Sequence, residues 1–586
     1  MYCGYSFPAN WKRIIIQLIP IVMIAGSPLI HFFPELALAQ TQVPLEAQQG
    51  ILDKSLSQSP PEFAPPPETE APEITNGGPK QDRRSLKDSG VGPKFFVKKI
   101  KLTGNTVISD ARLMPLVDLG EGMDVNLSIL NAMANKISAL YAGEGYLLAR
   151  AFIPKQEIVD GVVEIAILEG RINKVFVQGN KKLGKEKFKQ RMKMVQEEEV
   201  LQEQTLERVL LELNELMGVK VTTVLKPGDL PGTSDLVLEI TESQPYTFSI
   251  DSNNFGSAYT GPVAYGLSAT YANIFTLGDQ FSVRYSTSNM EMHAYSPFYT
   301  FPLNAYGTRM KTSYTFSENE LGGSLLSLAA GGSSHSVGLE VSQLLHKSRT
   351  ASFSARLGLD FKSSANEASG TNSSKDNLVN VSLGLGGNLS DSYLGRTFYD
   401  LKFQMGLREG DSTRGLGSRA SGHGKIFSTN INLTRMQSTN FLNSYFMLKL
   451  TGQVNNTRAL SSFLYAVGGM GTVRGYPISA NSGDMGYNVS AEYTVPFLAK
   501  DFPKMQAVSF IVFLEHGQIY VRDEQPGEID EHITGAGGGL KIVVPKGEGD
   551  NFGINFALTY GVPVFNSIPP ADSSHGIIYL NGMINY

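Results

Sequence analysis

Two kinds of hydrophobic pattern divide this 586-residue chain. Between about residues 95 and 241, short alternating runs are interspersed with segments whose apolar residues recur every three or four positions, which is the period of an amphipathic helix. From Tyr246 to Tyr586 only the alternating pattern remains, in short segments separated by Gly, Asn, Asp and Ser. Such alternation is typical of strands that have one apolar and one polar face. We therefore predict an α+β front part and an all-β back part.

The front part contains the same order of elements twice. Residues 94–170 and residues 171–245 each read as a strand, two helices and two strands, so the repeat is one of structure and not of sequence. In the first copy a long helix is predicted over residues 127–141, because its apolar residues share one face. In the second copy helices are predicted over residues 183–195 and 206–217. Small sheets of this kind have edges that can accept an added strand.

The back part, residues 246–586, contains about sixteen alternating segments. In one of them the apolar residues from Tyr487 to Phe497 alternate with Asn488, Ser490, Glu492 and Thr494. An even number of strands with one apolar face is typical of a transmembrane β-barrel. Past residue 40 no apolar run approaches the roughly 20 residues that a membrane helix needs. A soluble sandwich or propeller is the alternative, and the absence of blade repeats argues against the propeller.

The first 93 residues divide into an export signal and a linker. Residues 1–39 contain Lys12 and Arg13, an apolar run and the small-x-small sequence Ala37-Leu38-Ala39, so cleavage is predicted after Ala39. Residues 40–93 begin with a possible short helix over residues 43–56 and continue with a proline-rich stretch that cannot bury a core. We predict a short helix followed by an extended tether.

Composition excludes several functions. The only cysteine, Cys3, lies in the predicted signal, so the exported chain can form neither a disulfide nor a thiolate metal site. A net charge of −5 with 18% charged residues is too balanced for a nucleic-acid binder. The sequence has no Gly-x-Ser-x-Gly, His-Glu-x-x-His or complete Gly-x-x-x-x-Gly-Lys-[Ser/Thr] motif. We therefore expect no enzyme activity, no cofactor and no metal. Residues 415–420 read as a surface loop, and the basic cluster over residues 181–193 reads as a solvated helix face.

Two separated motifs stand out in the back part. Val473, Arg474, Gly475 and Tyr476 follow a glycine-rich run and fall between the eleventh and twelfth predicted strands. Phe513, Glu515 and Gly517 lie on the thirteenth strand, where alternation with Val512 and Leu514 turns Phe513 and Glu515 toward the inside of a barrel. Glu492 on the twelfth strand also points inward and reads as a lumen charge with no special partner.

These residues resemble the TpsB transporters of two-partner secretion, which are the haemolysin secretion/activation proteins of the superfamily that also contains the barrel-assembly protein BamA. Besides the two motifs, the resemblance rests on sequences in the front part and on Asn253-Asn254-Phe255-Gly256 in the first barrel hairpin. The sequences in the front part are Gly143-Glu144-Gly145-Tyr146, Pro154-Lys155-Gln156, Asp160-Gly161-Val162-Val163, Glu169-Gly170-Arg171-Ile172, Lys226-Pro227-Gly228 and Gly232-Thr233-Ser234-Asp235-Leu236.

The resemblance implies a mainly β fold in which a 16-stranded barrel follows two POTRA domains, with an N-terminal helix that plugs the pore. It implies that an inward loop carries Arg474, and an inward carboxylate needs such a cation, so we expect Arg474 to pair with Glu515. The family usually has Asp where this chain has Glu515.

The function that the resemblance implies is an outer-membrane pore whose periplasmic POTRA domains recognise an unfolded partner exoprotein, which then crosses without ATP. The alternation that ends at Tyr586 looks like an assembly signal for the barrel-assembly machinery. The expected partners are therefore an exoprotein, outer-membrane lipid and that machinery, with no nucleic acid. The alternative is a factor that inserts other barrels. Such relatives carry more POTRA domains, and a passive porin would have no use for them.

Overall fold

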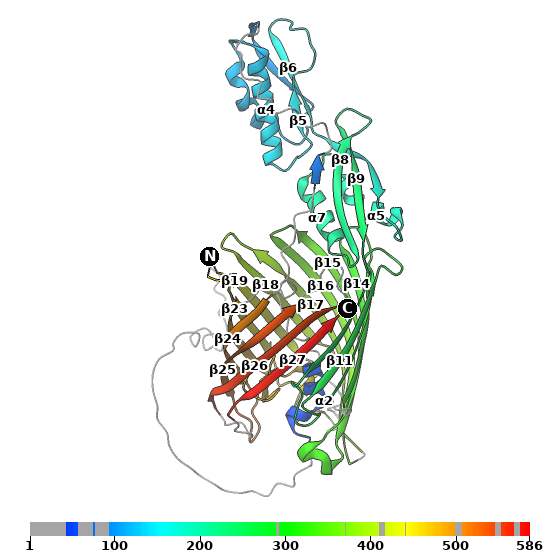
Figure 1. Cartoon of the computed structure of the whole chain (residues 1–586), viewed down its shortest axis with the longest axis vertical. Helices are drawn as coiled ribbons and strands as arrows, with labels where there is room; N and C mark the ends of the chain where they lie inside the picture. Colours follow the sequence, from blue (N-terminus) through cyan, green and yellow to red (C-terminus); the bar gives the residue numbers. More distant parts are fainter. Residues whose placement is uncertain are drawn as a thin grey trace, which may run out of the picture. The chain divides into compact units, whose positions relative to one another are not determined.

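A computed structural model describes residues 43–56, 74–76, 93–288, 292–369, 371–408, 417–439, 441–497, 507–544, 552–567 and 575–586. The predicted signal, residues 1–39, lies outside the described residues. The secondary structure of these residues is mostly strand, and sixteen of the strands form one closed barrel (Figure 1).

The first module forms a small sheet beside one long helix. Its three-stranded sheet has the order β3-β6-β5, and a separate pair joins β2 to β4. Its elements are β2 Phe95–Val97, β3 Lys99–Thr103, α3 Asp110–Leu113, η2 Met114–Leu116, η3 Asp118–Gly120, β4 Met123–Val125, α4 Leu127–Gly143, β5 Arg150–Phe152 and β6 Val162–Leu168. Leu130, Ala134, Ile137 and Tyr141 of α4 are buried against the sheet. The shorter of the two helices expected in this module is instead the three brief turns α3, η2 and η3, because Pro115 has no backbone N–H to continue an α-helix.

The second module also runs from one strand through helices to two strands, without counterparts of β2 and β4. Its elements are β7 Arg171–Gln178, α5 Lys185–Arg191, α6 Lys193–Glu197, α7 Glu203–Asn214, β8 Val219–Pro227 and β9 Thr233–Glu242. The helix expected over residues 183–195 is broken at Met192, which is fully buried between α5 and α6. The hydrophobic core of the second module contains Phe188, Leu206, Leu210 and Leu238.

A glutamate at the end of the last strand ties each module together. In the first module Glu169 Oε1 accepts hydrogen bonds from the backbone N–H groups of Thr106 and Val107, at 2.6 and 3.0 Å. In the second module Glu242 accepts from the three N–H groups of residues 181–183, at 2.9 to 3.0 Å. The two modules therefore repeat an anchoring contact that the sequence comparison between them did not reveal.

Residues 179–185 carry the glycine and lysine spacing of a phosphate-binding loop, although Glu186 stands where such a loop has Ser or Thr. In a phosphate-binding loop the backbone N–H groups hold the phosphates. Here the Glu242 carboxylate already occupies the three successive N–H groups of this turn. The turn is thus a structural contact of the second module.

Sixteen antiparallel strands form the barrel, each hydrogen-bonded to its neighbours in sequence order, and the last pairs with the first. The strands are β10 Tyr246–Asn253, β11 Ala264–Ala272, β12 Gln280–Ser288, β13 Met292–Pro302, β14 Thr308–Glu320, β15 Gly331–Lys347, β16 Ala351–Ala368, β17 Thr371–Ser390, β18 Gly395–Gly406, β19 Phe427–Ser438, β20 Tyr445–Asn455, β23 Met485–Phe497, β24 Ala507–Tyr520, β25 Glu531–Val544, β26 Gly553–Asn566 and β27 Ile577–Asn585. A short 3-10 helix, η4 Gly323–Leu328, lies between β14 and β15.

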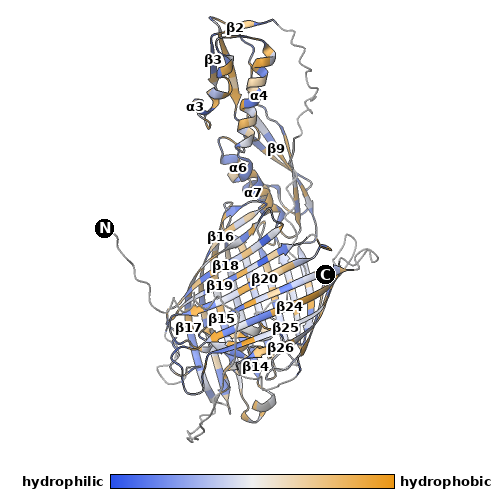
Figure 2. Cartoon of the chain, turned by 90° about the vertical axis from the view of Figure 1, so that its left-hand side faces the viewer, coloured by the Kyte–Doolittle hydropathy of each residue, from blue (hydrophilic) through white to orange (hydrophobic). Residues whose placement is uncertain are grey.

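The outer face of the barrel is apolar. On β24 the side chains of Phe510, Val512 and Leu514 are 52 to 56% exposed, whereas Phe513 and Glu515 are 5% exposed or less. Figure 2 shows the same alternation of apolar and polar residues along the barrel strands. An apolar exterior with buried polar residues is the arrangement that a lipid environment requires.

Basic side chains of the second module bind the barrel turns that face it. Arg208 Nη2 donates to the backbone oxygens of Tyr306 and Leu344, at 3.0 and 2.8 Å. Arg191 Nη2 donates to the oxygen of Leu277 at 2.7 Å, and Lys187 Nζ donates to that of Phe275 at 2.8 Å. The expectation that residues 181–193 form only a solvated face is wrong for Lys187 and Arg191. These contacts identify the end of the barrel that is nearest the second module.

The N-terminal segment places a helix inside the barrel. A 3-10 turn, η1 Leu45–Ala47, precedes α2 Gln49–Leu56. Ile51 packs on Leu460 and Leu464 of the loop that follows β20, and η6 Ser461–Phe463 lies in that loop. The predicted tether also contains a strand, β1 Ile74–Asn76, which pairs with β8 in the second module. The rest of the predicted tether, residues 57–73 and 77–92, lies outside the described residues.

Candidate functional site

The loop between β20 and β23 folds into the barrel. It carries a short hairpin, β21 Tyr465–Val467 and β22 Asn481–Gly483, and the Val473-to-Tyr476 motif lies at its tip. Val473 and Tyr476 are fully buried, and they pack with Val467, Ile519 and Ile533. The tip is thus held by apolar packing against the barrel wall as well as by the polar contacts below.

Arg474 is the centre of the polar contacts. Its Nε and Nη2 atoms donate to Glu515 Oε1 at 3.0 and 2.6 Å, and its backbone N–H donates to Glu515 Oε2 at 2.7 Å. The guanidinium carbon lies 3.4 Å from the centre of the Phe513 ring, a cation–π contact. The structure therefore brings Arg474 together with Glu515 and Phe513, the two inward residues of the second motif.

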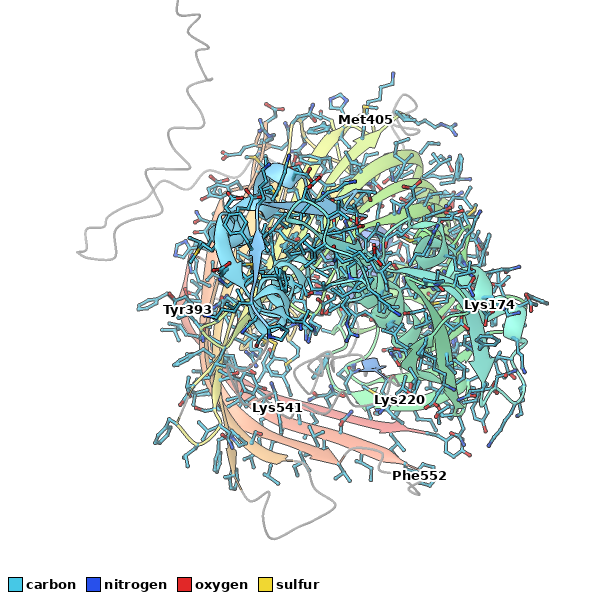
Figure 3. The ribbon with its side chains drawn as sticks, turned by 90° about the horizontal axis from the view of Figure 1, so that it is seen from above. Lys174, Lys220, Tyr393, Met405, Lys541 and Phe552 are labelled. Carbon is cyan, nitrogen blue, oxygen red and sulfur yellow. The ribbon has the colours of Figure 1, made fainter. Side chains whose placement is uncertain are left out.

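Glu492 takes part in the same cluster, so the expectation that it lacks a special partner is wrong. Arg474 Nη1 donates to Glu492 Oε2 at 3.0 Å, and Lys541 Nζ donates to Glu492 Oε1 at 2.5 Å. The four groups carry two positive and two negative charges in a row, from Lys541 to Glu515. Figure 3 labels Lys541 on the inner side of the strand wall and Tyr393 on the outer side. Sequence reasoning missed Lys541, although its place in an otherwise apolar run, Leu540 to Val544, was a usable signal.

Glycines of the wall make room for this tip. A Cβ atom at Gly535 would lie 1.9 Å from the Arg474 oxygen, and one at Gly517 would lie 3.0 Å from side-chain atoms of Val467 and Val473. Gly475 itself has φ of +99°, a conformation that glycine adopts without strain. Gly475 is therefore favoured by its backbone conformation, and a larger residue at Gly517 would fit only tightly against Val467 and Val473.

Tyrosine hydroxyls complete the attachment of the tip. The backbone N–H of Gly475 donates to the hydroxyl of Tyr579 at 3.0 Å, and that hydroxyl lies 3.1 Å from the oxygen of Tyr476. The hydroxyl of Tyr476 reaches the backbone oxygens of Thr534 and Phe565, at 3.1 and 2.9 Å. The loop tip is thereby bound to strands β25, β26 and β27.

Helix α2 is held on the other side of the lumen by β14 and β16. The Gln49 backbone N–H donates to Asn366 Oδ1, and its side-chain amide donates to Ser317 Oγ, both at 2.8 Å. Asp53 forms an ion pair with Lys362 at 2.7 Å. These contacts lie near the barrel end opposite the turns that bind the second module, because Asn366 is close to the end of β16.

A second cluster of charges joins the loops at that same end. Arg419 pairs with Asp484 at 2.8 Å, and Arg458 donates twice to Glu528, at 2.6 and 2.8 Å. Burial alone would raise the pKa of Glu528, but hydrogen bonds from Arg458 and the charges of both arginines lower it to about 2. The expectation of a surface loop over residues 415–420 is wrong for Ser418 and Arg419, which are buried.

The chain end closes the barrel. Tyr586 exchanges two backbone hydrogen bonds with Phe248 of β10, at 2.7 and 3.2 Å, and its ring stacks on that of Tyr246 at 6.3 Å between centroids. Within the described ranges, no helix is long and apolar enough to cross a membrane, and no group of three or more candidate ligands could hold a metal ion.

A closed 16-stranded barrel with an inward loop, preceded by two α+β modules, defines the class of outer-membrane barrels that carry POTRA domains. A family model for the haemolysin secretion/activation protein ShlB/FhaC/HecB matches residues 232–542, and one for the POTRA domain of ShlB type matches residues 95–170. The chain belongs to the haemolysin secretion/activation protein family.

Relatives and solved structures agree with this assignment. The chain is 25% identical over 417 residues to the heme/hemopexin transporter protein HuxB of Haemophilus influenzae, covering 69% of this chain and 72% of that one. It is 23% identical over 446 residues to the outer membrane transporter CdiB of Dickeya dadantii, covering 73% and 77%. The fold matches the structure of CdiB from Escherichia coli with a TM-score of 0.71 at 19% identity, over 92% and 96% of the two chains. The protein is a two-partner secretion transporter of the outer membrane, and its POTRA domains lie in the periplasm.

Proposed function

We propose that this protein captures an unfolded partner exoprotein with its periplasmic POTRA domains and passes it through the barrel to the cell surface without ATP. The observation that carries the proposal is the filling of the lumen by two separate pieces, the inward loop and α2, each held by side-chain contacts and not by the strand ladder. Pieces attached in this way can be displaced while the wall stays closed. A passive pore would have no need of them.

The proposed division of labour follows the chain. Residues 40–93 supply the plug helix and its tether, residues 94–170 and 171–245 are the two POTRA domains, and residues 246–586 form the pore. Arg474, Glu515 and their neighbours act as the latch that holds the inward loop. The absence of a complete nucleotide-binding motif from the sequence supports transport without ATP.

The experiment is reconstitution of the purified full chain in lipid vesicles without nucleotide. A candidate exoprotein, encoded beside the transporter gene and bearing a signal peptide and β-helical repeats, is offered unfolded on the POTRA side. Protection of the exoprotein from added protease supports secretion. If unfolded barrel proteins insert into the vesicles faster and the exoprotein is never protected, the protein is instead a barrel-insertion factor.

A further inference from the structure

Two neighbouring turns at the barrel end nearest the second module expose large apolar side chains. The turn between β17 and β18 carries Tyr393 and Leu394, which are 80 and 64% exposed. The turn between β19 and β20 carries Phe441 and Leu442, which are 63 and 61% exposed. The turns lie side by side, because Gln437 Nε2 of β19 donates to the Tyr393 oxygen at 2.5 Å. We call the four apolar residues of these turns the rim patch.

The backbone of the rim patch is unusual for the residues that form it. Leu394 has φ of +62° and Leu442 has φ of +50°, in the left-handed region that suits glycine or asparagine. Among the described residues, ten residues other than glycine have positive φ, and these two leucines are the only large apolar ones. The conformation is strained for a leucine. Exposure of the same side chains to water adds a further cost, so we expect a surface that covers them.

Polar contacts hold both turns in this conformation. Asp391 Oδ1 accepts a hydrogen bond from the Tyr393 N–H at 3.0 Å, and Asp391 Oδ2 pairs with Arg435 at 2.6 Å. In the second turn the N–H of Ser444 donates to the Phe441 oxygen at 2.9 Å. The rim patch is therefore presented by a fixed backbone, and a fixed surface loses little conformational entropy when it is covered.

The rim patch continues the apolar outer face of the barrel. Leu389 near the end of β17 and Phe446 near the start of β20 lie on that face, 51 and 44% exposed. Figure 3 shows Tyr393 on the outer side of the strand wall. The residue lies two positions before β18 begins at Gly395, a distance of about 7 Å at most in extended chain. The headgroup layer on each side of the hydrocarbon core is about 5–8 Å thick, so the turns reach no farther than that layer.

We propose that the rim patch is a lipid-anchoring surface, which inserts into the phospholipid headgroup layer of the periplasmic leaflet of the outer membrane. Leucine and aromatic side chains favour this layer, and the Tyr393 hydroxyl can reach water from it. The nearby charges of Arg435 and Asp391 neutralise each other, so the pair does not oppose this placement. Anchoring holds the pore mouth at a fixed depth beside the turns that bind the second module. The inference does not depend on which polypeptide the pore carries.

The first experiment measures contact with lipid by tryptophan fluorescence. Trp11, the only tryptophan, lies in the predicted signal, so one tryptophan introduced into the exported chain is observed alone. Purified full chains with Tyr393→Trp or Phe441→Trp are reconstituted in vesicles of phosphatidylethanolamine and phosphatidylglycerol, with and without brominated phospholipid. The references are Leu448→Trp on the outer face of β20 and Leu119→Trp in the first POTRA domain, whose natural side chains are 50 and 74% exposed.

Brominated lipid should quench both tryptophans of the rim patch about half as strongly as Leu448→Trp, or more. Both should also emit at shorter wavelength than Leu119→Trp. If iodide quenches them as it quenches Leu119→Trp and brominated lipid does not, the rim patch faces water and the proposal is wrong. Emission at short wavelength without quenching by brominated lipid shows that a protein segment covers the patch, which also overturns the proposal.

The second experiment uses the outer membrane itself. Cys3 is the only cysteine and lies in the predicted signal, so Phe441→Cys or Leu119→Cys supplies the single thiol of the exported chain. In isolated outer membranes, Phe441→Cys should react with a membrane-impermeant maleimide on the order of tenfold more slowly than Leu119→Cys. Adding Leu394→Gly and Leu442→Gly keeps the left-handed turns without strain and removes two anchors, so Phe441→Cys should then react several-fold faster. Equal rates for Phe441→Cys and Leu119→Cys, or no acceleration by the glycines, contradict the proposal.

Discussion

At the residue scale, the proposed latch is a row of four charged groups and not one ion pair. Arg474 lies between Glu515 and Glu492, and Lys541 balances the second carboxylate. A planar guanidinium can bind two carboxylates and stack on Phe513 at the same time, which an ammonium group cannot do. Sequence reasoning found the pair because both motifs were recognisable. It missed the contacts of Arg474 with Glu492 and of Glu492 with Lys541. These two residues belong to no motif, and they meet only when β23 and β25 close around the loop.

The first prediction concerns Arg474. Arg474→Ala leaves two buried carboxylates without their shared cation, which costs on the order of 3–5 kcal/mol for a buried pair broken from one side. We expect strong loss of transport with a barrel that still inserts. Glu515→Ala should be similar in kind but milder, because Arg474 keeps Glu492. The measurement is exoprotein export beside heat-modified mobility of the barrel in gels.

The double variant and two conservative variants complete this test. Arg474→Ala with Glu515→Ala should be no worse than Arg474→Ala alone, since the single change already removes their interaction. Glu515→Asp keeps the charge that the family usually has and should keep most of the transport, whereas Arg474→Lys loses the two-sided hydrogen bonding. If the export losses of the two single variants simply added in the double variant, or if Arg474→Ala exported normally, the loop would only fill space in the lumen.

The second prediction concerns the glutamate anchors of the POTRA domains. Glu169→Gln can keep its amide oxygen at the Oε1 position for Thr106 and Val107, but it removes the negative charge and places an NH2 group where Oε2 accepts from the Thr106 hydroxyl. It should therefore destabilise the first domain by about 1–3 kcal/mol. Glu242→Gln should do the same to the second domain. Domain-specific hydrogen exchange of the full chain measures both. If either variant accelerated hydrogen exchange equally in both POTRA domains, the assignment of one glutamate anchor to each domain would be wrong.

The same anchor predicts a pH dependence. Burial alone would raise the pKa of Glu169, but hydrogen bonds from Thr106, Val107 and Tyr141 outweigh it and hold the pKa below the ordinary value of 4.5. The ionised anchor therefore contributes its full stability above about pH 4.5, and this contribution is lost as the pH falls through the lowered pKa. Exchange in the first domain should accelerate over that acidic range in the natural chain and remain flat in Glu169→Gln.

At the scale of elements, α2 is held by a small number of close contacts. A Cβ atom at Gly50 would lie 2.5 Å from Ser461 Oγ and 2.7 Å from the Ser462 nitrogen, so helix and inward loop touch at this glycine. Helix α2 therefore contacts the same inward loop that carries Arg474. Displacing the helix disturbs that loop at η6, some distance along the chain from Arg474.

The third prediction concerns this helix. Deletion of residues 40–56 should raise ion conductance in planar bilayers and leave export largely intact, because the helix must leave the lumen for transport in any case. Gly50→Leu should also raise conductance without shortening the chain, since the larger side chain cannot fit against the loop. Asp53→Asn, which keeps the shape and removes the charge opposite Lys362, should have an intermediate effect. Unchanged conductance in all three would refute the plug.

The sequence predicted those elements whose hydrophobic pattern lies within the element itself. The sixteen strands and α4 follow from periodicity, which burial of one face enforces along each segment. The breaks at Pro115 and Met192, and the pairing of β1, were not predictable in this way. Three residues carry no readable period, and the partner of β1 lies about 150 residues away in the sequence.

At the scale of the whole molecule, the barrel closes along the seam between β10 and β27. Only five residue pairs join β10 to β27, from Ser249↔Asn585 to Asn253↔Asn581, and Tyr586 extends the seam through Phe248 and Tyr246. The sequence indicated the number of strands and the terminal aromatic residue. It could not reveal the contacts of Tyr579, Gly535 and Gly561 with the inward loop, because these residues are far from the loop in sequence and meet it only after closure.

The fourth prediction concerns this seam. Tyr586→Asp puts a charge beside two aromatic rings at the lipid boundary and should lower the amount of barrel in the outer membrane, while export to the periplasm continues. Tyr586→Phe keeps the ring and should assemble normally. Quantitative blotting of membrane and periplasmic fractions measures both. Equal amounts of heat-modifiable barrel for Tyr586→Asp would contradict the role of this residue as an assembly signal.

The polar wall that holds α2 determines what a moving chain would meet once the helix is gone. Apart from Lys362, which pairs with Asp53 of the helix, the wall here consists of small neutral groups such as Ser317, Asn319 and Asn366, which exchange one hydrogen-bonding partner for another at little net cost. A polypeptide that moves along these neutral groups would find many equivalent hydrogen-bonding positions. Along these groups the wall would resist the movement of different polypeptide sequences to a similar and small extent. Net motion must come from whatever prevents return at the outer surface, so the speed of export would depend on how fast the emerged segment folds.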